Sequence, residues 1–173
     1  MILTNYFLKR KLKTLIAQLT NRKRVFYSLK EAHRILVIYD SKERDALEPC
    51  VETLRMLRKK VTTCLFVSSG SPQSKEEGYL YVNGQKDIDI WGFPTQAKCK
   101  EINSCQADIL IYMGLDNNYT LQYLMLQHPC LFKVGARQDG PEIFDLSILV
   151  TKKADLRFLF GQILFYLQTI RAK

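Results

Sequence analysis

The segment Arg34–Ser41, which reads RILVIYDS, decides the fold. Its residues 35–39 form a short apolar run rich in β-branched side chains, followed by an acid and a hydroxyl. Such a run is typical of a strand buried on both faces, as in the interior of a parallel sheet. The pattern returns at residues 109–113, ILIYM. We therefore expect these two segments to lie side by side in the middle of a covered sheet.

Segments with helical periodicity separate the predicted strands. Residues 47–57 place apolar side chains on one helical face, and Val61–Val67 reads as the next strand, which predicts a right-handed βαβ unit. Asn83-Gly84 is a hairpin-turn signal between Tyr79–Val82 and Asp87–Trp91. Further strands are expected at 131–134 and 144–150, and helices at 119–127 and 154–171. The prediction is an α/β, three-layer Rossmann-like domain with a mostly parallel central sheet.

The positive charge is concentrated at the start of the chain. Residues 1–34 contain nine of the 26 lysines and arginines but one of the 17 acids, so they carry +8 of the total +9. Leucines 8, 12, 15 and 19 recur at helical spacing, which predicts an amphipathic helix over residues 2–20. We divide the chain into a basic amphipathic helical arm, 1–30, and a Rossmann-like α/β domain, 31–173.

The basic arm suggests a docking function. A cationic amphipathic helix suits a polyanion, either RNA or an anionic membrane surface, or a protein partner. The side chains that would carry this contact are Lys9, Arg10, Lys13, Arg22, Lys23 and Arg24. The alternative is a helix that packs on its own domain and turns a solvated basic face outward.

The predicted C-terminal helix has two apolar faces and must therefore contact two surfaces. One stripe contains Leu156, Phe160 and Ile163, and Phe158 and Phe165 lie on the opposite side. We expect the N-terminal helix to cover the second face. A second copy of the chain, in a homodimer, is the other interpretation.

Ligands of open α/β sheets bind beyond the carboxyl ends of the strands, where the strand order reverses. A nucleotide or sugar phosphate is the ligand class considered for such a crevice. Helix capping and turn formation explain the same residue types equally well. The candidate side chains at predicted strand ends are Asp40, Ser41, Ser68, Ser69, Asp116, Asn117, Asn118 and Arg137.

No catalytic, metal or cofactor motif is recognisable. The chain contains two histidines, and its five cysteines lack the spacing of a zinc site. An odd number of cysteines without a disulfide pattern indicates reduced thiols and a cytoplasmic protein. No apolar run is long enough for a transmembrane helix, and Lys9, Arg10 and Lys11 interrupt the place where a secretory signal would lie.

Two family resemblances are visible. The segment ADILIYMGLDNNYTLQYLMLQHPCLFKVGARQD, 107–139, resembles the N-terminal half of heptosyltransferase-type glycosyltransferases, whose Lys/Arg-x-Gly turn is matched by Lys133-Val134-Gly135. That family binds its nucleotide sugar mainly through a second Rossmann half. The present chain has no room for one, so transferase activity is not expected.

Over nearly its whole length the sequence resembles an uncharacterised bacterial family, a domain of unknown function. The shared segments are LKRKLKTL, RKRVFYSLKEA, ILVIYDS, IWGFP, ADILIYM, FKVG and FLFGQILFYLQTI. This resemblance supports a single Rossmann-like domain and supplies no information on activity. The sequence thus favours a non-catalytic cytoplasmic binding module that docks through its basic helix. The alternative is a small enzyme or sensor with a ligand at the strand ends.

Overall fold

The computed structural model of the chain describes residues 2–19, 21–70, 76–151 and 155–171. The strands in these ranges are β1 (Arg34–Asp40), β2 (Lys60–Val67), β3 (Tyr79–Asn83), β4 (Ile109–Tyr112), β5 (Lys133–Ala136) and β6 (Leu146–Ile148). The helices are α1 (Ile2–Leu19), the 3-10 turn η1 (Ser41–Glu43), α2 (Arg44–Met56), α3 (Gln96–Asn103), α4 (Tyr119–Gln127) and α5 (Leu156–Thr169).

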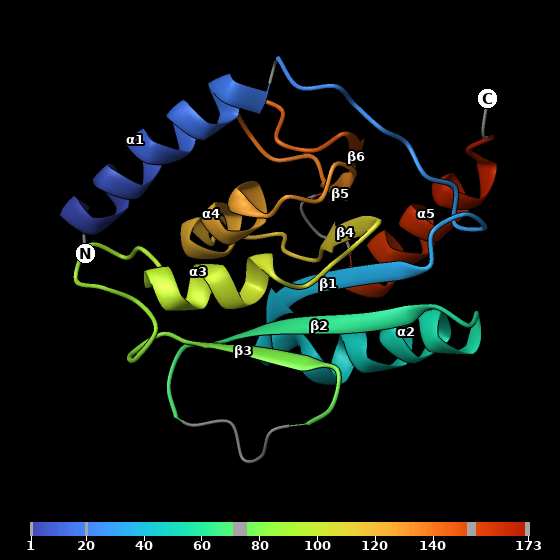
Figure 1. The fold of residues 1–173 in the computed structure, drawn as a ribbon, viewed down its shortest axis with the longest axis horizontal. Coiled ribbons are helices and arrows are strands. Elements are labelled where there is room, and N and C mark those ends of the chain that lie inside the picture. The colour runs from blue at the N-terminus through green and yellow to red at the C-terminus, as the bar shows by residue number, and fades with distance from the viewer. Residues whose placement is uncertain (1, 20, 71–75, 152–154, 172–173) are drawn as a thin grey trace.

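All six of these strands belong to one sheet, in the order β3-β2-β1-β4-β5-β6, and each neighbouring pair is parallel (Figure 1). β1 lies in the middle, where Ile35 is in register with Val61 of β2 and with Ile109 of β4. Residues 35–39 are buried on both faces. The predicted α/β class and the predicted neighbourhood of the two apolar segments are therefore confirmed.

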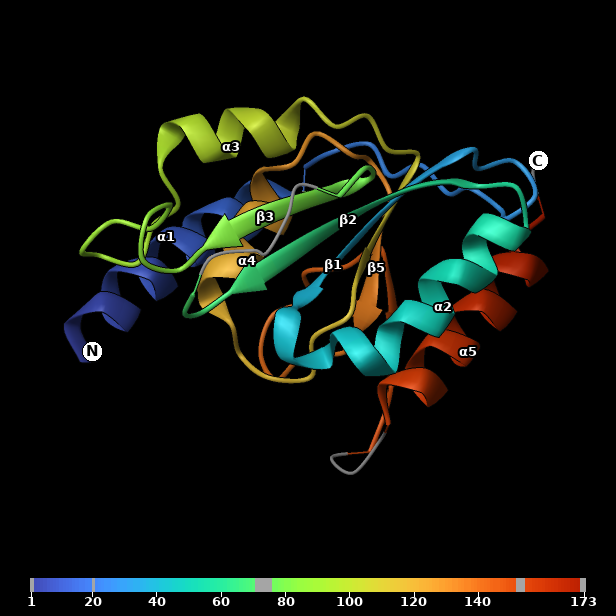
Figure 2. The same cartoon turned by 90° about the horizontal axis from the view of Figure 1, so that it is seen from below.

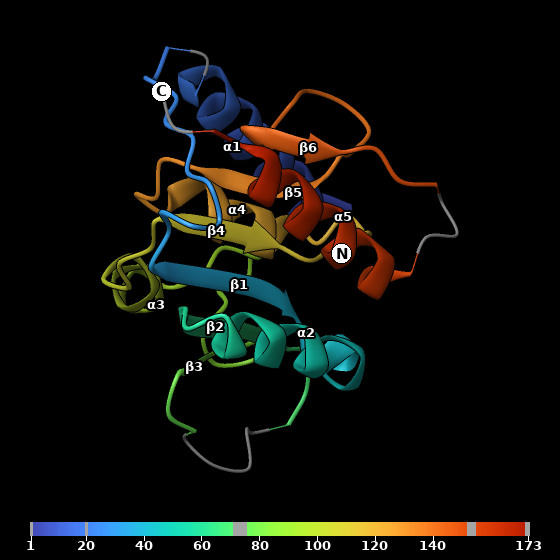
Figure 3. The ribbon, with the colours of Figure 1, turned by 90° about the vertical axis from the view of Figure 1, so that its right-hand side faces the viewer.

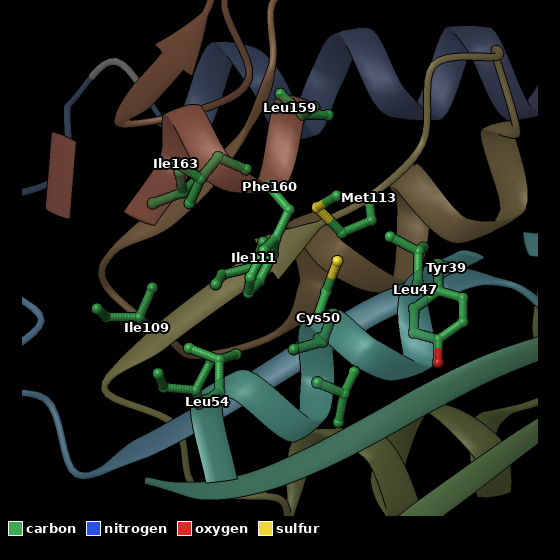
Figure 4. Close-up of a cluster of buried hydrophobic side chains, with 14 of the residues drawn as sticks. Tyr39, Leu47, Cys50, Leu54, Ile109, Ile111, Met113, Leu159, Phe160 and Ile163 are labelled. Carbon is green, nitrogen blue, oxygen red and sulfur yellow. The ribbon is translucent and has the colours of Figure 1, made fainter. Parts of the chain in front are cut away.

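Alternate residues of the central strands enter two separate cores, because successive side chains of a strand point to opposite faces. Ile35, Val37 and Tyr39 join the core beneath α2 and α5, which is shown in Figure 4. Leu36 and Ile38 join the core on the other face, with residues of α3 and α4. Figures 2 and 3 show these helices on the two sides of the sheet, which makes three layers.

The N-terminal helix α1 packs against α4, outside the sheet. Leu8 and Leu12 are buried there, and Leu12 belongs to the same core as Leu124 and Met125 of α4. The expectation that α1 covers the second face of α5 is wrong, because α5 lies on the opposite side of the sheet. Phe158 and Phe165 on that face of α5 are each 57% exposed.

The predicted hairpin after Asn83 is also wrong. β3 pairs in parallel with β2, and residues 87–91 form no strand. Asn83 does start a turn, since its side-chain Oδ1 accepts hydrogen bonds from the backbone of Gln85 and Lys86. Beyond it, the isolated bridge between Ile88 and Pro94 closes a separate small loop, so the chain does not return along β3.

The described part of the chain includes no helix that combines the length and the apolar character needed to cross a membrane.

Candidate functional site

The strand order reverses between β1 and β4. From β1 the chain builds outward through β2 and β3, and then returns to place β4 on the other side of β1. Ligands of such sheets occupy the crevice beyond the carboxyl ends at this switch point. A hollow of about 790 Å³ lies there, lined by the ends of β1 and β4, the following loops, the starts of α4 and α5, two residues of α1 and one of β2.

Tyr112, the last residue of β4, forms the inner wall of this hollow. Its side chain is fully buried, and its hydroxyl has no hydrogen-bond partner among the described residues. Burial, with Asp116 and Asp40 as minor contributors, raises the pKa of Tyr112, so the phenol keeps its proton at neutral pH. The wall of the hollow therefore contains a buried neutral hydroxyl, and leaving it unpaired is energetically costly.

The orientation of Tyr112 depends on two glycines. A Cβ on Gly114 would lie 2.6 Å from the Tyr112 hydroxyl oxygen, so only glycine allows this close approach. The Tyr112 ring stacks on Phe144 at a centroid distance of 6.0 Å. A Cβ on Gly135 would in turn collide with the Phe144 ring at 2.5 Å. The two rings are thus held in one arrangement behind the hollow.

The mouth of the hollow is predominantly acidic. Its lining includes the carboxylates of Asp40, Glu43, Asp116 and Asp155 and the ammonium group of Lys42. Lys42 Nζ lies 3.2 Å from Asp116 Oδ2, and this hydrogen bond raises the pKa of Lys42. Because both side chains of the pair are exposed, the ion pair contributes little to stability and can be displaced by a ligand.

Some of these acids and amides also organise the backbone. Asp40 Oδ1 accepts a hydrogen bond from the Lys42 backbone at the start of η1. Asn118 Oδ1 accepts one from Leu121 and caps α4, and Asp155 caps α5 in the same way. The capping interpretation of Asp40 is therefore confirmed, whereas Asn118, which was expected to form a turn, caps α4. Both residues still line the hollow.

Half of the predicted strand-end residues meet in this hollow, namely Asp40, Asp116, Asn117 and Asn118. Ser41 lies in η1 but is not part of the lining. Ser68 and Ser69 follow β2 as exposed residues outside the crevice. Arg137 lines a neighbouring hollow of about 430 Å³, and Asp116 and Asn117 line both hollows. The Arg137 Nη1 atom lies 3.6 Å from Glu142 Oε2.

The predicted polyanion residues lie elsewhere and differ in exposure. Arg22 forms an ion pair with Asp145 and also donates a hydrogen bond to the Cys130 carbonyl oxygen, so it fastens the connector after α1 to the domain. Lys9 lies over the ring of Tyr119, 5.0 Å from its centroid. The remaining members of the set are exposed, and they form no ion pair within the described ranges: Arg10, Lys13, Lys23 and Arg24.

Sequence reasoning missed the residues that complete the hollow. Tyr112 could have been found, because a tyrosine at the end of an apolar strand carries a polar group into the crevice region. Asn5 and Asp155 could not, because they reach the hollow from α1 and from the start of α5. No cluster of three or more His, Cys, Asp or Glu side chains suited to a metal ion occurs among residues with described positions.

The parallel sheet with helices on both faces, together with a polar hollow at its switch point, defines a Rossmann-like α/β protein. The chain belongs to the family described as Family of unknown function (DUF6913), whose model matches residues 5–170. No curated protein and no solved structure gives a significant match to it.

Proposed function

We propose that this protein binds a small polar ligand in the crevice between β1 and β4. The observation that carries the proposal is Tyr112, which lines a hollow of about 790 Å³ and whose buried hydroxyl has no partner among the described groups. That volume is within the range of small-molecule sites. A ligand oxygen or nitrogen that accepts this hydrogen bond would remove the cost of an unpaired buried hydroxyl.

The charge of the lining indicates the chemistry of the ligand. In dinucleotide-binding domains a phosphate sits at the N-terminus of the helix that follows the first strand. Here Asp40 and Glu43 occupy that position, and carboxylates repel a phosphate. Hydroxyl and amine groups, in contrast, can donate to the acids at the mouth while accepting from Tyr112. We therefore favour a sugar, a polyol or a small amine over a nucleotide or a free sugar phosphate.

Binding, rather than catalysis, suits the groups that are present. Neither histidine lines the hollow; His128 is buried, with its Nε2 atom 2.9 Å from the Cys105 carbonyl oxygen, and His33 is exposed at the start of β1. The hollow thus lacks the side chain most often used for proton transfer at neutral pH. A carrier or sensor of a small metabolite is the corresponding biological function.

A cytoplasmic location is part of the same proposal. All five cysteines are free thiols. Cys64 and Cys130 are buried, and burial raises the pKa of both thiols, which keeps them protonated and unreactive. Buried protonated thiols of this kind are compatible with a reducing compartment.

The experiment compares Tyr112→Phe with Tyr39→Phe in a thermal-shift and calorimetric screen. The probes are glucose, ribose, glycerol, putrescine, AMP and inorganic phosphate. Tyr39 is the matched control, because it is also fully buried with an unpaired hydroxyl but faces the α2–α5 core. We expect a neutral sugar, polyol or amine to bind the wild type. Loss of one hydrogen bond in Tyr112→Phe then weakens its affinity about fivefold to tenfold, while Tyr39→Phe binds normally.

Both variants should be at least as stable as the wild type without ligand, because each removes a buried hydroxyl that lacks a partner. The proposal is wrong if none of the neutral or amine probes binds. It is also wrong if Tyr112→Phe and Tyr39→Phe alter the affinity equally.

A further inference from the structure

A second surface, separate from the crevice, combines aromatic and basic side chains. A hollow of about 490 Å³ lies between α1 and the loop before α3, lined by Phe7, Arg10, Lys11, Thr14, Trp91 and Phe93. We call these six residues, together with Ile90, the basic aromatic surface. In Figures 1 and 2 the loop between β3 and α3 lies beside the N-terminal half of α1.

The loop presents an apolar tip that is held by hydrogen bonds. Asp89 Oδ1 accepts from the backbone N–H groups of Trp91, at 2.8 Å, and Phe93, at 2.9 Å. The Gly92 N–H donates to the Asp89 carbonyl oxygen, and the positive φ of Gly92, 85°, is a conformation that suits glycine. At the tip, Ile90 is 84% exposed and Trp91 is 46% exposed. The fixed turn therefore holds two large apolar side chains in solvent.

The helix contributes the basic part. Phe7, Arg10 and Lys11 have the spacing of one helical face. The Phe7 ring meets Trp91 edge to face at 5.0 Å, which joins the helix to the loop. Arg10 and Lys11 are exposed and form no ion pair with any residue that the structure describes. Two cations thus lie without a counter-charge beside an exposed apolar tip.

We propose that the basic aromatic surface docks on an anionic lipid membrane. Tryptophan and phenylalanine favour the boundary between headgroups and acyl chains, and arginine and lysine reach from apolar surroundings to the headgroups. A basic face beside large apolar side chains is typical of proteins that lie on a membrane, and anionic lipids supply the complementary charge. Ile90 would enter the acyl boundary, and Arg10 and Lys11 would contact lipid phosphates.

Nucleic acid fits this surface less well. Single strands are bound by aromatic faces on which bases stack. Here the Phe7 and Trp91 rings meet at an interplanar angle of 73°, so they cannot form a parallel stacking platform together. The exposed aliphatic side chain of Ile90 also has no partner in a phosphate backbone, whereas a membrane accommodates it directly.

Trp91 makes the test direct, because it is the only tryptophan in the chain. The full chain is titrated with vesicles of phosphatidylcholine alone and with vesicles of phosphatidylcholine mixed with phosphatidylglycerol. We expect the tryptophan emission to shift to shorter wavelength only with the vesicles that contain phosphatidylglycerol, since the indole leaves water on docking. Salt should weaken the binding, because it screens the basic side chains.

Two variants separate charge from insertion, and each has a matched control. Arg10→Gln/Lys11→Gln removes two positive charges while keeping good helix-forming residues, and we expect about a tenfold or larger loss of vesicle affinity. Lys30→Gln/Lys60→Gln makes the same charge change at exposed sites away from this surface, and should bind normally. Ile90→Ser should also weaken binding, while Leu149→Ser should not, although Leu149 is similarly exposed at 82%.

Three outcomes would overturn the proposal. One is the absence of binding to anionic vesicles. A second is vesicle binding that falls in Arg10→Gln/Lys11→Gln but is unchanged in Ile90→Ser, with no shift of the Trp91 emission; this would show electrostatic adsorption without insertion of the apolar tip. The third is an equal loss in the variants and their controls. None of these outcomes bears on the ligand of the crevice.

Discussion

At the scale of single residues, Lys133 places an ionisable amine in buried surroundings. It is the first residue of β5, it is buried, and its Nζ reaches the Leu126 carbonyl oxygen at 3.4 Å. Burial lowers the pKa of Lys133 from 10.5 to about 8, and the nearby charge of Arg22 adds to this effect. At neutral pH the side chain is thus mostly protonated in surroundings that disfavour its charge.

We expect Lys133→Met to be more stable than the wild type at pH 7. The lowered pKa corresponds to a cost of up to about 3 kcal/mol, so a gain of roughly 1–3 kcal/mol is expected after loss of the hydrogen bond. The folded wild type binds fewer protons than the unfolded chain between pH 8 and 10.5, so its stability rises with pH in that window. The gain should therefore shrink toward pH 10.5.

Urea denaturation of Lys133→Met and the wild type at pH 7 and at pH 10 measures this gain. Lys60→Met, at an exposed position, is the control and should show no such pH dependence. If the unfolding free energies of Lys133→Met and the wild type differ by the same amount at both pH values, the charge of Lys133 is not the cause of the gain in stability.

At the scale of elements, α1 is bound to the domain by its leucines. Leu8 and Leu12 are buried against α4, whereas the basic side chains of the same helix face solvent. The periodicity of the leucines identified this stripe correctly. It did not identify the partner helix, because an apolar stripe is complementary to any other apolar surface.

Leu12→Ala should lower the unfolding free energy by about 2–4 kcal/mol, since it leaves a cavity between α1 and α4. Chemical denaturation followed by circular dichroism provides the measurement. Lys13→Ala, one residue along and exposed, should have little effect. If Leu12→Ala is as stable as Lys13→Ala, the helix is not packed as described.

At the scale of the whole molecule, no residue that the structure describes covers the outer face of α5. Phe158 and Phe165 are each 57% exposed, and Tyr166 beside them is 43% exposed. The Phe165 and Tyr166 rings meet edge to face at 5.5 Å. Exposed apolar patches of this kind favour association with another surface. We therefore propose that two copies of the chain associate through α5.

Light scattering over a range of protein concentrations tests association through α5. We expect the weight-average mass to rise toward that of a dimer, and Phe158→Ser/Phe165→Ser to hold it at the monomer value. Ile90→Ser/Leu149→Ser, which removes exposed apolar side chains elsewhere, should behave as the wild type. A monomer at the highest concentration would exclude the dimer.

Local patterns in the sequence were sufficient for much of the fold. The apolar runs at 35–39 and 109–113, the α4 range 119–127 and the capping role of Asp40 all follow from interactions within a few residues. Burial periodicity and end-capping act over that distance, so a single segment carries the whole signal. Prediction was poorer where a segment is short, as at β5, which was expected two residues earlier.

Tertiary structure alone decided which distant segments meet. It placed Asn5 and Asp155 in the same hollow as Tyr112, left Ser68 and Ser69 outside the crevice, and brought Phe7 to Trp91. It also put α1 on α4 instead of α5. The physical reason is that apolar surfaces attract one another without specifying a partner, so the choice depends on the strand order and on the packing of the whole core. The sequence by itself determined most of the elements and the buried faces of the central strands, and the packing of the whole chain determined the sites.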